Sequence, residues 1–223
     1  MQNVRITTLA FVITGISVHF PVIASAQADF EGIWNAQHPP RMGQPPPDEV
    51  RLTPAGQAEY DNFSLDKDPT LRCLMPGIPL GLVDPYPLEI VQQDHQVLFL
   101  YEHFHQVRRI FTDGREAPDH WLPSLIGYST GHWDGDTLVV DVIHFTDQTW
   151  FDRSGNFHSP SLHVVERYTR TGPDHMRYEV TIEDPEVFTE PWQMSMPLYR
   201  RVEENIRVLE YECYALAEDQ AVE

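Results

Sequence analysis

Positive charge is scarce in this chain. The 223 residues include 15 lysines and arginines against 34 aspartates and glutamates, a formal net charge of −19 at pH 7. Because binding to nucleic acid needs clustered positive charge, we expect no nucleic-acid partner. Lys67 is the sole lysine, so nearly all positive charge is on arginine, whose planar guanidinium suits carboxylates. We therefore expect several acidic residues to have arginine partners inside the molecule.

The sequence also lacks the short motifs that name a reaction. Ser129, Ser159 and Ser161 have none of the Gly-x-Ser-x-Gly surroundings of a hydrolase nucleophile. There is no glycine-rich phosphate loop, no dinucleotide-binding fingerprint and no Cys-x-x-Cys pair. We therefore expect neither a serine nucleophile nor a bound cofactor.

Long hydrophobic runs are confined to residues 1–26. Arg5 precedes an apolar stretch from Ile6 to Ile23, and Ala24-Ser25-Ala26 follows it. This order is typical of a secretory signal peptide cleaved after Ala26, whereas a membrane anchor would be longer and would lack the small-residue ending. No later stretch reaches about 18 uninterrupted apolar residues, so we expect no integral membrane contact after cleavage.

Cleavage would leave 197 of the 223 residues, enough for one sizeable core but short for two. We expect one domain, in which residues 27–87 join a β-barrel body formed by residues 88–223. Residues 27–87 would supply an N-terminal strand, a proline-rich wrap and a short helix.

Prolines shape this N-terminal part. Five prolines between His38 and Pro47 favour an extended surface segment, and five more between Asp68 and Pro87 favour a second irregular wrap. Thr53 as N-cap and Pro54 at the first helical position predict the one helix, within residues 52–60.

Cysteine is limited to Cys73 and Cys213. In an exported chain a disulfide is the default, and two cysteines allow one intramolecular connectivity. The bridge would contribute about 3–5 kcal/mol in the chain-entropy model. The alternative is a pair of buried free thiols.

Segments with the residue pattern of β-strands are abundant in this sequence. The run from Gly131 to Phe145 contains two strands around Asp134-Gly135-Asp136, whose glycine suits the positive φ of a tight hairpin turn. Similar apolar or alternating segments predict eight strands, at 88–93, 97–111, 128–133, 137–145, 163–170, 176–182, 193–201 and 207–214.

Several segments together resemble a group of exported bacterial proteins of unassigned activity. The resemblance rests on Pro85–Ile90, Arg108–Arg115, Gly131–Asp141 with its G-x-W-x-G-D-T-L-V-V-D signature, and the later His158-Ser159 and Glu210-Tyr211-x-Cys213. It covers most of the chain after the signal peptide. Tyr128 stands where these proteins more often have His, and the usual Glu-Asn after the last cysteine is missing. The resemblance implies a periplasmic or secreted location but no reaction.

The Gly-x-Trp at Gly32–Trp34 also resembles the first strand of lipocalin-like barrels, in which the tryptophan closes one end. With this strand the count reaches nine, which favours a barrel. We predict an all-β fold: a lipocalin-like, calycin-type antiparallel up-and-down β-barrel. Small barrels of this kind enclose one small ligand.

Residues 97–111, taken as one strand, place ionisable groups on both faces. Alternation puts His103, His105 and Arg109 with Tyr101, and Glu102 with Gln106 and Arg108. A strand packed on a simple core would have one apolar face, so we expect a partly polar ligand cavity. The alternative is a Glu102–Arg108 ion pair with a structural role alone.

Two functions of different class follow. The first is binding of a small apolar or aromatic molecule, with Arg109 or Glu102 fixing its polar end. The residues expected to contact the ligand are Trp34, Tyr101, His103, His105, Asp141, Trp150 and Trp192.

The second is a cofactor-independent lyase, isomerase or hydratase. His158 and Glu102 would move protons, Arg108 or Arg109 would stabilise an oxyanion, and Glu166 is an alternative partner that orients His158. This hypothesis requires His158 and Glu102 to converge within hydrogen-bond reach. The signature that recurs in the group of exported proteins which this chain resembles includes Glu102, Arg108, Arg109, His158, Glu166 and Arg167.

Two weaker alternatives remain open. His103 and His105, two apart on a strand, could share a metal ion, but Arg108 and Arg109 follow closely and disfavour a cation. A structural or partner-binding envelope protein would use the proline segment 38–47 and would need an exposed apolar patch.

Overall fold

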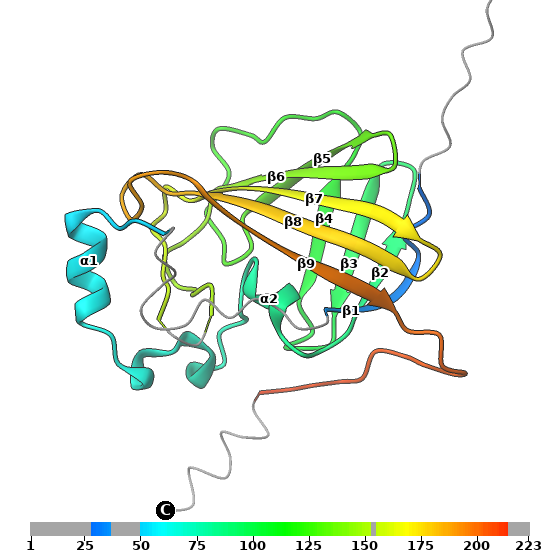
Figure 1. Ribbon diagram of the computed structural model, residues 1–223, viewed down its shortest axis with the longest axis horizontal. Coiled ribbons are helices and arrows are strands. Elements are labelled where there is room, and N and C mark those ends of the chain that lie inside the picture. Colours follow the sequence, from blue (N-terminus) through cyan, green and yellow to red (C-terminus); the bar gives the residue numbers. More distant parts are fainter. Residues whose placement is uncertain (1–27, 37–49, 153–154, 214–223) are drawn as a thin grey trace, which may run out of the picture.

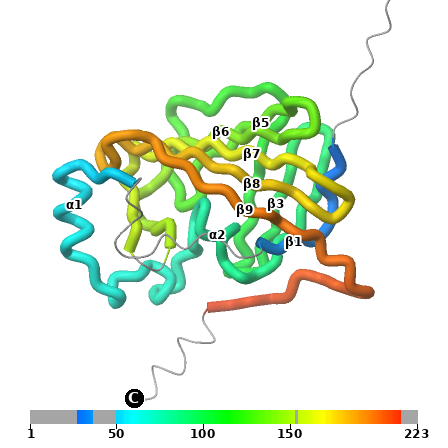
Figure 2. Tube along the Cα trace, in the orientation of Figure 1, coloured from blue at the N-terminus to red at the C-terminus, as the bar shows by residue number. Residues whose placement is uncertain are grey.

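The computed structural model describes residues 28–36, 50–152 and 155–213, so the predicted signal peptide and proline segment 38–47 lie outside the described residues. Nine strands form a closed barrel in chain order (Figures 1 and 2). They are β1 Gly32–Ala36, β2 Leu88–Gln92, β3 Gln96–Tyr101, β4 Val107–Phe111, β5 Tyr128–Asp134, β6 Thr137–Ile143, β7 His163–Gly172, β8 His175–Glu183 and β9 Trp192–Arg200. The predicted all-β barrel is confirmed.

One strand pair departs from the up-and-down prediction. β4 and β5 are parallel, with Ile110 opposite Ser129 and Phe111 opposite Thr130, whereas every other neighbouring pair is antiparallel. A ring of nine strands cannot alternate direction all the way round, because nine is odd. The long connection formed by residues 112–127 returns the chain to the starting end of the barrel and makes this parallel pair.

The predicted strand 97–111 is two strands. Phe104 and His105 both have left-handed backbones, with φ of +60° and +48°, and the Tyr101 amide donates to the Gln106 carbonyl at 2.9 Å. The alternation therefore stops at Tyr101 and restarts at Val107. The predicted strand 207–214 was also wrong, since within its described part only Tyr211 makes an isolated bridge, to His103.

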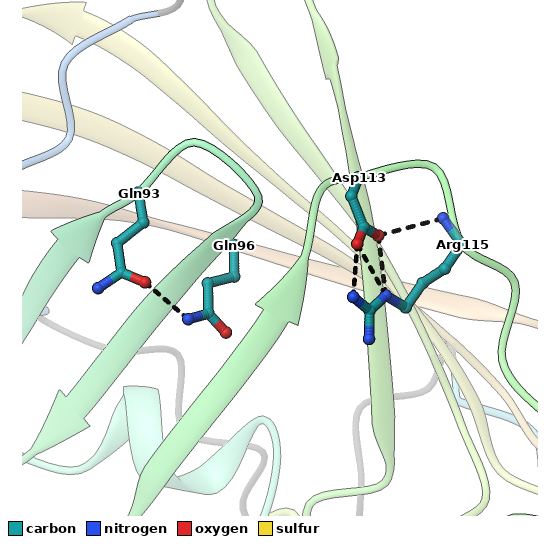
Figure 3. A network of polar contacts seen from close by, with 4 residues as sticks. All are labelled: Gln93, Gln96, Asp113 and Arg115. Carbon is teal, nitrogen blue, oxygen red and sulfur yellow. Dashed lines mark hydrogen bonds and ion pairs between the residues drawn. The ribbon is translucent and has the colours of Figure 1, made fainter.

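The tight turns follow local chemistry. Thr137 pairs with Asp134 across a turn in which Gly135 has φ +61°, so the predicted hairpin is confirmed. Between β2 and β3, Gln96 donates to Gln93 at 2.6 Å (Figure 3). After β4, the Arg115 Nε lies 2.8 Å from an Asp113 oxygen, at the start of the connection to β5 (Figure 3).

Trp34 is buried toward the end of the barrel at which β9 finishes, since it pairs with Arg200. Its ring is fully buried, its Nε1 donates to the Phe30 carbonyl at 2.9 Å, and the Arg170 guanidinium lies 5.0 Å from the ring centroid. Apolar side chains from all nine strands pack between this end and the other, among them Leu88, Phe99, Leu138, Val164, Tyr178 and Leu198.

Helices lie outside the strands (Figure 1). Helix α1 Pro54–Asp61 begins as predicted, because the Thr53 hydroxyl accepts from the Gly56 amide at 3.0 Å. Helix α2 Leu80–Val83 was not predicted and lies in the proline-containing wrap, after two short 3-10 turns. Among the described residues, no helix is both long and apolar enough to cross a membrane.

The C-terminal segment turns back after β9 and is fixed by a disulfide (Figure 2). Cys73 and Cys213 are bonded, with Cα atoms 5.5 Å apart, which confirms the predicted pairing. The Leu209 amide donates to Glu102 at 2.8 Å, and the Tyr211 ring lies 4.8 Å from that of Tyr86. The segment is thereby held against the β3–β4 turn and the wrap.

Candidate functional site

A buried ion pair crosses the inside of the barrel. Arg108 of β4 donates from Nη2 to Glu166 of β7, and from Nε to the Ser129 hydroxyl at 3.0 Å. The second Glu166 oxygen accepts from the hydroxyls of Tyr168 at 2.8 Å and Tyr178 at 2.9 Å. Glu166 and Tyr168 are two apart on one strand, so both point inward. Four strands therefore supply one polar cluster in an otherwise apolar interior.

Burial sets the charge states in this cluster. Burial lowers the pKa of Arg108, but the charge and hydrogen bond of Glu166, together with the neighbouring Tyr168 and Tyr101, raise it by more, so the net shift is upward and the guanidinium stays charged. Burial raises the pKa of Tyr101 to about 12, and the Arg108 charge opposes it only in part. Burial likewise raises the pKa of Tyr168 and Tyr178 well above 10. All three phenols are neutral hydrogen-bond donors at neutral pH.

Three polar atoms beside the ion pair have no partner among the described residues. They are Arg108 Nη1 and both amide atoms of Gln106, which precedes Arg108 by two positions. Gln106 and Arg108 are each 1% exposed. Gly81 of α2 packs closely against Gln106 and Tyr101, because a Cβ there would be 3.3 Å from Gln106 Nε2 and 3.5 Å from the Tyr101 ring. We call Gly81, Tyr101, Gln106 and Arg108 the head site.

His158 does not meet Glu102. Its Nδ1 is 3.1 Å from the Ser159 carbonyl oxygen, which can only accept, so Nε2 accepts from the Thr149 hydroxyl at 2.7 Å. Burial lowers the pKa of His158, so the ring is neutral. Its bonds tie together the loop between β6 and β7, and both ring nitrogens are used.

Glu102 lies half-buried at the surface and accepts from the Leu209 amide. The predicted Glu102–His158 acid–base pair is therefore absent from the described hydrogen bonds. The alternative pairing of Glu102 with Arg108 was also wrong, because Glu166 is the partner of Arg108. Residue 102 falls in the turn, which breaks the alternation on which that pairing depended.

The two histidines of the β3–β4 turn take different partners. His103 is buried, its Nδ1 lies 2.7 Å from an Asp84 oxygen, and its ring stacks on Tyr86 at 4.5 Å. His105 is exposed and lies 2.6 Å from Glu212. No group of three or more potential metal ligands is found in the part of the chain that the structure describes.

The remaining predicted ligand contacts are dispersed. Arg109 is exposed on the outer face of β4, and Asp141 is exposed on β6 and bonded to His163 at 2.8 Å. Trp192 begins β9 and lies 5.8 Å from Phe151, at the opposite end of that strand from the Trp34 partner Arg200.

Trp150 is half-buried beside Phe63, with ring centroids 5.8 Å apart. Of the predicted site residues, the structure thus brings together Tyr101, Arg108 and Glu166. Hollows lined by described residues also occur outside the barrel, for example one of about 350 Å³ over Arg167, Glu179 and Gln193.

Sequence reasoning missed five members of this region as site residues: Gly81, Gln106, Ser129, Tyr168 and Tyr178. Tyr168 could have been found, because the spacing Glu166-x-Tyr168 places a hydroxyl on the same face of the strand as the Glu166 carboxylate. No sequence pattern marks Gly81, because it lies in α2, a helix that was not predicted in this proline-containing segment.

Comparisons with known proteins add little to this geometry. No family model matches the chain, and no curated protein matches it. A solved structure of a mutant of the fluorescent protein UnaG is similar, with 16% sequence identity and a TM-score of 0.35. The match covers 78% of this chain and 97% of that chain. The barrel assigned to this chain accordingly rests on its own strand pairing.

Proposed function

We propose that this protein is an exported small-molecule-binding barrel whose ligand places a polar group at the head site. The observation that carries the proposal is the cluster of unpartnered buried atoms on Gln106 and Arg108. A buried donor or acceptor without a partner costs about 1–3 kcal/mol, and native proteins keep few of them. A bound group that pairs with them recovers this cost.

The surroundings favour an apolar or aromatic body on the same ligand. Tyr101 and Phe99 line the inner face of β3, and Leu82 of α2 belongs to the same buried apolar cluster. Ligand pockets are commonly built in this way, from apolar walls with a few convergent polar groups.

Export is the second part of the proposal. The signal-peptide pattern of residues 1–26 supports it, and so does the Cys73–Cys213 disulfide, because disulfides persist mainly in oxidising compartments. Amino-terminal sequencing of protein recovered from a bacterial periplasm tests it. A first residue of Gln27 is expected, and an uncleaved Met1 in a membrane fraction would contradict it.

Binding is tested by the thermal unfolding of the mature chain with a panel of aromatic and aliphatic compounds. A ligand at 100 times its Kd stabilises by about 2.7 kcal/mol, which is a measurable rise in Tm. We expect a saturable rise with some members of the panel. Unchanged Tm values across a panel that includes acids, amides, ketones and hydrocarbons would reject the proposal.

A second candidate function, acid–base catalysis, is favoured by one observation. Asp84 holds Nδ1 of His103, while Nε2 of His103 makes no hydrogen bond to a described residue. An imidazole oriented in this way can act as a general base. Assays for lyase and isomerase activity with wild type and His103→Gln test it, and equal rates for the two proteins would reject it.

A further inference from the structure

We propose that residues 201–213, which we call the strap, form a redox-controlled cover over the buried His103–Asp84 pair. The strap continues the chain after β9, and its last described residue is Cys213. It covers the pair while Cys73 and Cys213 are bonded, and reduction of this disulfide releases it. The proposal is independent of any ligand in the barrel.

The strap supplies one of the rings around His103. Tyr211 pairs with His103 in an isolated bridge, and the two rings lie 5.2 Å apart. The Phe104 amide donates to the Tyr211 carbonyl at 3.2 Å. The rings of Tyr86 and Phe104 also contact His103, at 4.5 Å and 4.3 Å, and His103 is 3% exposed. Of these three rings Tyr211 alone belongs to the strap, so it can leave without a change in the barrel.

Along its middle the strap is loosely attached to the barrel. Residues 202–210 are all described, and none of them is buried. A hollow of about 370 Å³ is lined by strap residues 203–207 together with Pro87 and Glu102, so this part does not pack closely on the strands. Segments with few buried contacts open at a low free-energy cost. The ends of the strap therefore decide whether it stays closed.

The two ends are held differently. At its start the strap leads directly out of β9, which the ladder with β1 fixes. At the far end the Leu209 amide donates to Glu102, and His105 lies 2.6 Å from Glu212. Both contacts are at least partly exposed, and such contacts contribute little individually. The bond from Cys213 is the covalent attachment at this end, so its state determines whether the cover stays in place.

The position of Cys73 opens the disulfide to reduction. Cys73 is exposed, whereas Cys213 is 9% exposed, so a thiolate from solution reaches the sulfur of Cys73 first. Attack by one thiolate of a dithiol reductant breaks the S–S bond, and the Cys213 sulfur leaves as a thiolate and takes up a proton. The second thiol of the reductant then closes its own disulfide and releases Cys73 as a thiol. Exposed disulfides are the ones that serve labile and regulatory roles.

Histidine reactivity tests the cover without any ligand. The mature protein is treated with diethyl pyrocarbonate, which modifies accessible imidazoles, in its disulfide-bonded form and after reduction by dithiothreitol, which is then removed. Peptide mass spectrometry gives the rate at each histidine. We expect His103 to react at least about tenfold faster in the reduced form. His158, buried in the loop between β6 and β7, and His175, exposed on β8, should each react at the same rate in both forms.

Variants separate the cover from the disulfide. Tyr211→Ala keeps the disulfide and removes the ring beside His103, so His103 should react faster even in the oxidised protein. Tyr199→Ala, on β9, is the matched control and should leave His103 protected. Cys73→Ser/Cys213→Ser should match reduced wild type.

Three results would overturn the proposal. Equal His103 rates in the two redox forms, or in Tyr211→Ala and wild type, would show that the strap is not the cover. A disulfide that dithiothreitol reduces only in denaturant would show that the cover is not redox-controlled. A rise at His158 together with His103 would show that reduction unfolds the barrel instead of releasing the strap. Because no barrel ligand is used, each of these results leaves the test of ligand binding unaffected.

Discussion

The guanidinium of Arg108 and the carboxylate of Glu166 form an ion pair inside the barrel, and neither side chain is more than 1% exposed. The two ends of the pair are not equally satisfied. Both Glu166 oxygens are occupied, by Arg108 and by two tyrosine hydroxyls, whereas Arg108 keeps Nη1 unpartnered. The guanidinium is therefore the less completely hydrogen-bonded partner of the pair.

Removing one partner of the ion pair should be strongly destabilising. Glu166→Gln leaves the Arg108 charge buried without compensation, and we expect a loss of about 3–5 kcal/mol in the free energy of unfolding. The double variant Arg108→Met/Glu166→Leu should recover much of that loss. Urea unfolding measures both. Arg167→Met, which breaks an exposed pair with Asp134, is the matched control and should cost at most about 1 kcal/mol.

The buried phenols should titrate late. Of the nine tyrosines, Tyr101 has a pKa of about 12, and Tyr168 and Tyr178 titrate well above 10. A pH titration of the folded protein, followed by phenolate absorbance, should therefore show these three tyrosines still un-ionised at pH 11. In urea all nine should titrate together near pH 10.

These tyrosines also predict the direction of alkaline stability. Above pH 10 the unfolded chain releases phenolic protons that the folded chain keeps, so the free energy of unfolding should fall as the pH rises further. Tyr178→Phe should make this fall shallower. A slope unchanged by the substitution would contradict the assigned burial.

His158 should make the protein less stable in acid. Burial lowers its pKa below the unfolded value of about 6.5, so the unfolded state binds the proton more readily. The stability that comes from the neutral buried ring is fully present above that value and is lost as the pH falls through the folded pKa. His158→Gln should therefore be most destabilising at pH 8, with the deficit shrinking toward pH 5. A deficit that grows in acid would show that the folded ring is preferentially protonated. His175→Gln, at an exposed position on β8, controls for removal of an imidazole.

The disulfide should be a large stabiliser because it joins residues 140 apart. Loss of the bond in Cys73→Ser/Cys213→Ser should lower the free energy of unfolding by about 3–5 kcal/mol. It should also speed amide exchange at Leu209, whose bond to Glu102 holds the C-terminal segment in place. Reduced wild type should behave like the double variant, and unchanged exchange at Leu209 would contradict the anchoring role.

The parts of the fold that were predictable from sequence are those with a local cause. Gly135 indicated the β5–β6 hairpin, and Thr53 with Pro54 indicated the start of α1. The two cysteines allowed only one intramolecular disulfide. The β3–β4 turn was missed because Phe104 and His105 adopt left-handed backbones without glycine, asparagine or proline to mark them. The parallel β4–β5 pair was missed because it follows from the closure of an odd ring.

Several members of the candidate site were predicted, but the ion pair between Arg108 and Glu166 was not. Arg108, Glu166 and Tyr101 were all proposed as site residues, yet the partner of Arg108 was taken from its own strand. Glu166 approaches Arg108 from three strands away along the chain, across the interior, and only barrel closure brings the two together.

Ligand binding in the barrel is tested most directly by native mass spectrometry of the mature protein, taken from the periplasm to the spectrometer without a denaturing step. We expect a mass above that of the disulfide-bonded chain, with a small organic molecule released on denaturation. In protein recovered in this way, the bare mass of the disulfide-bonded chain as the sole species would contradict it.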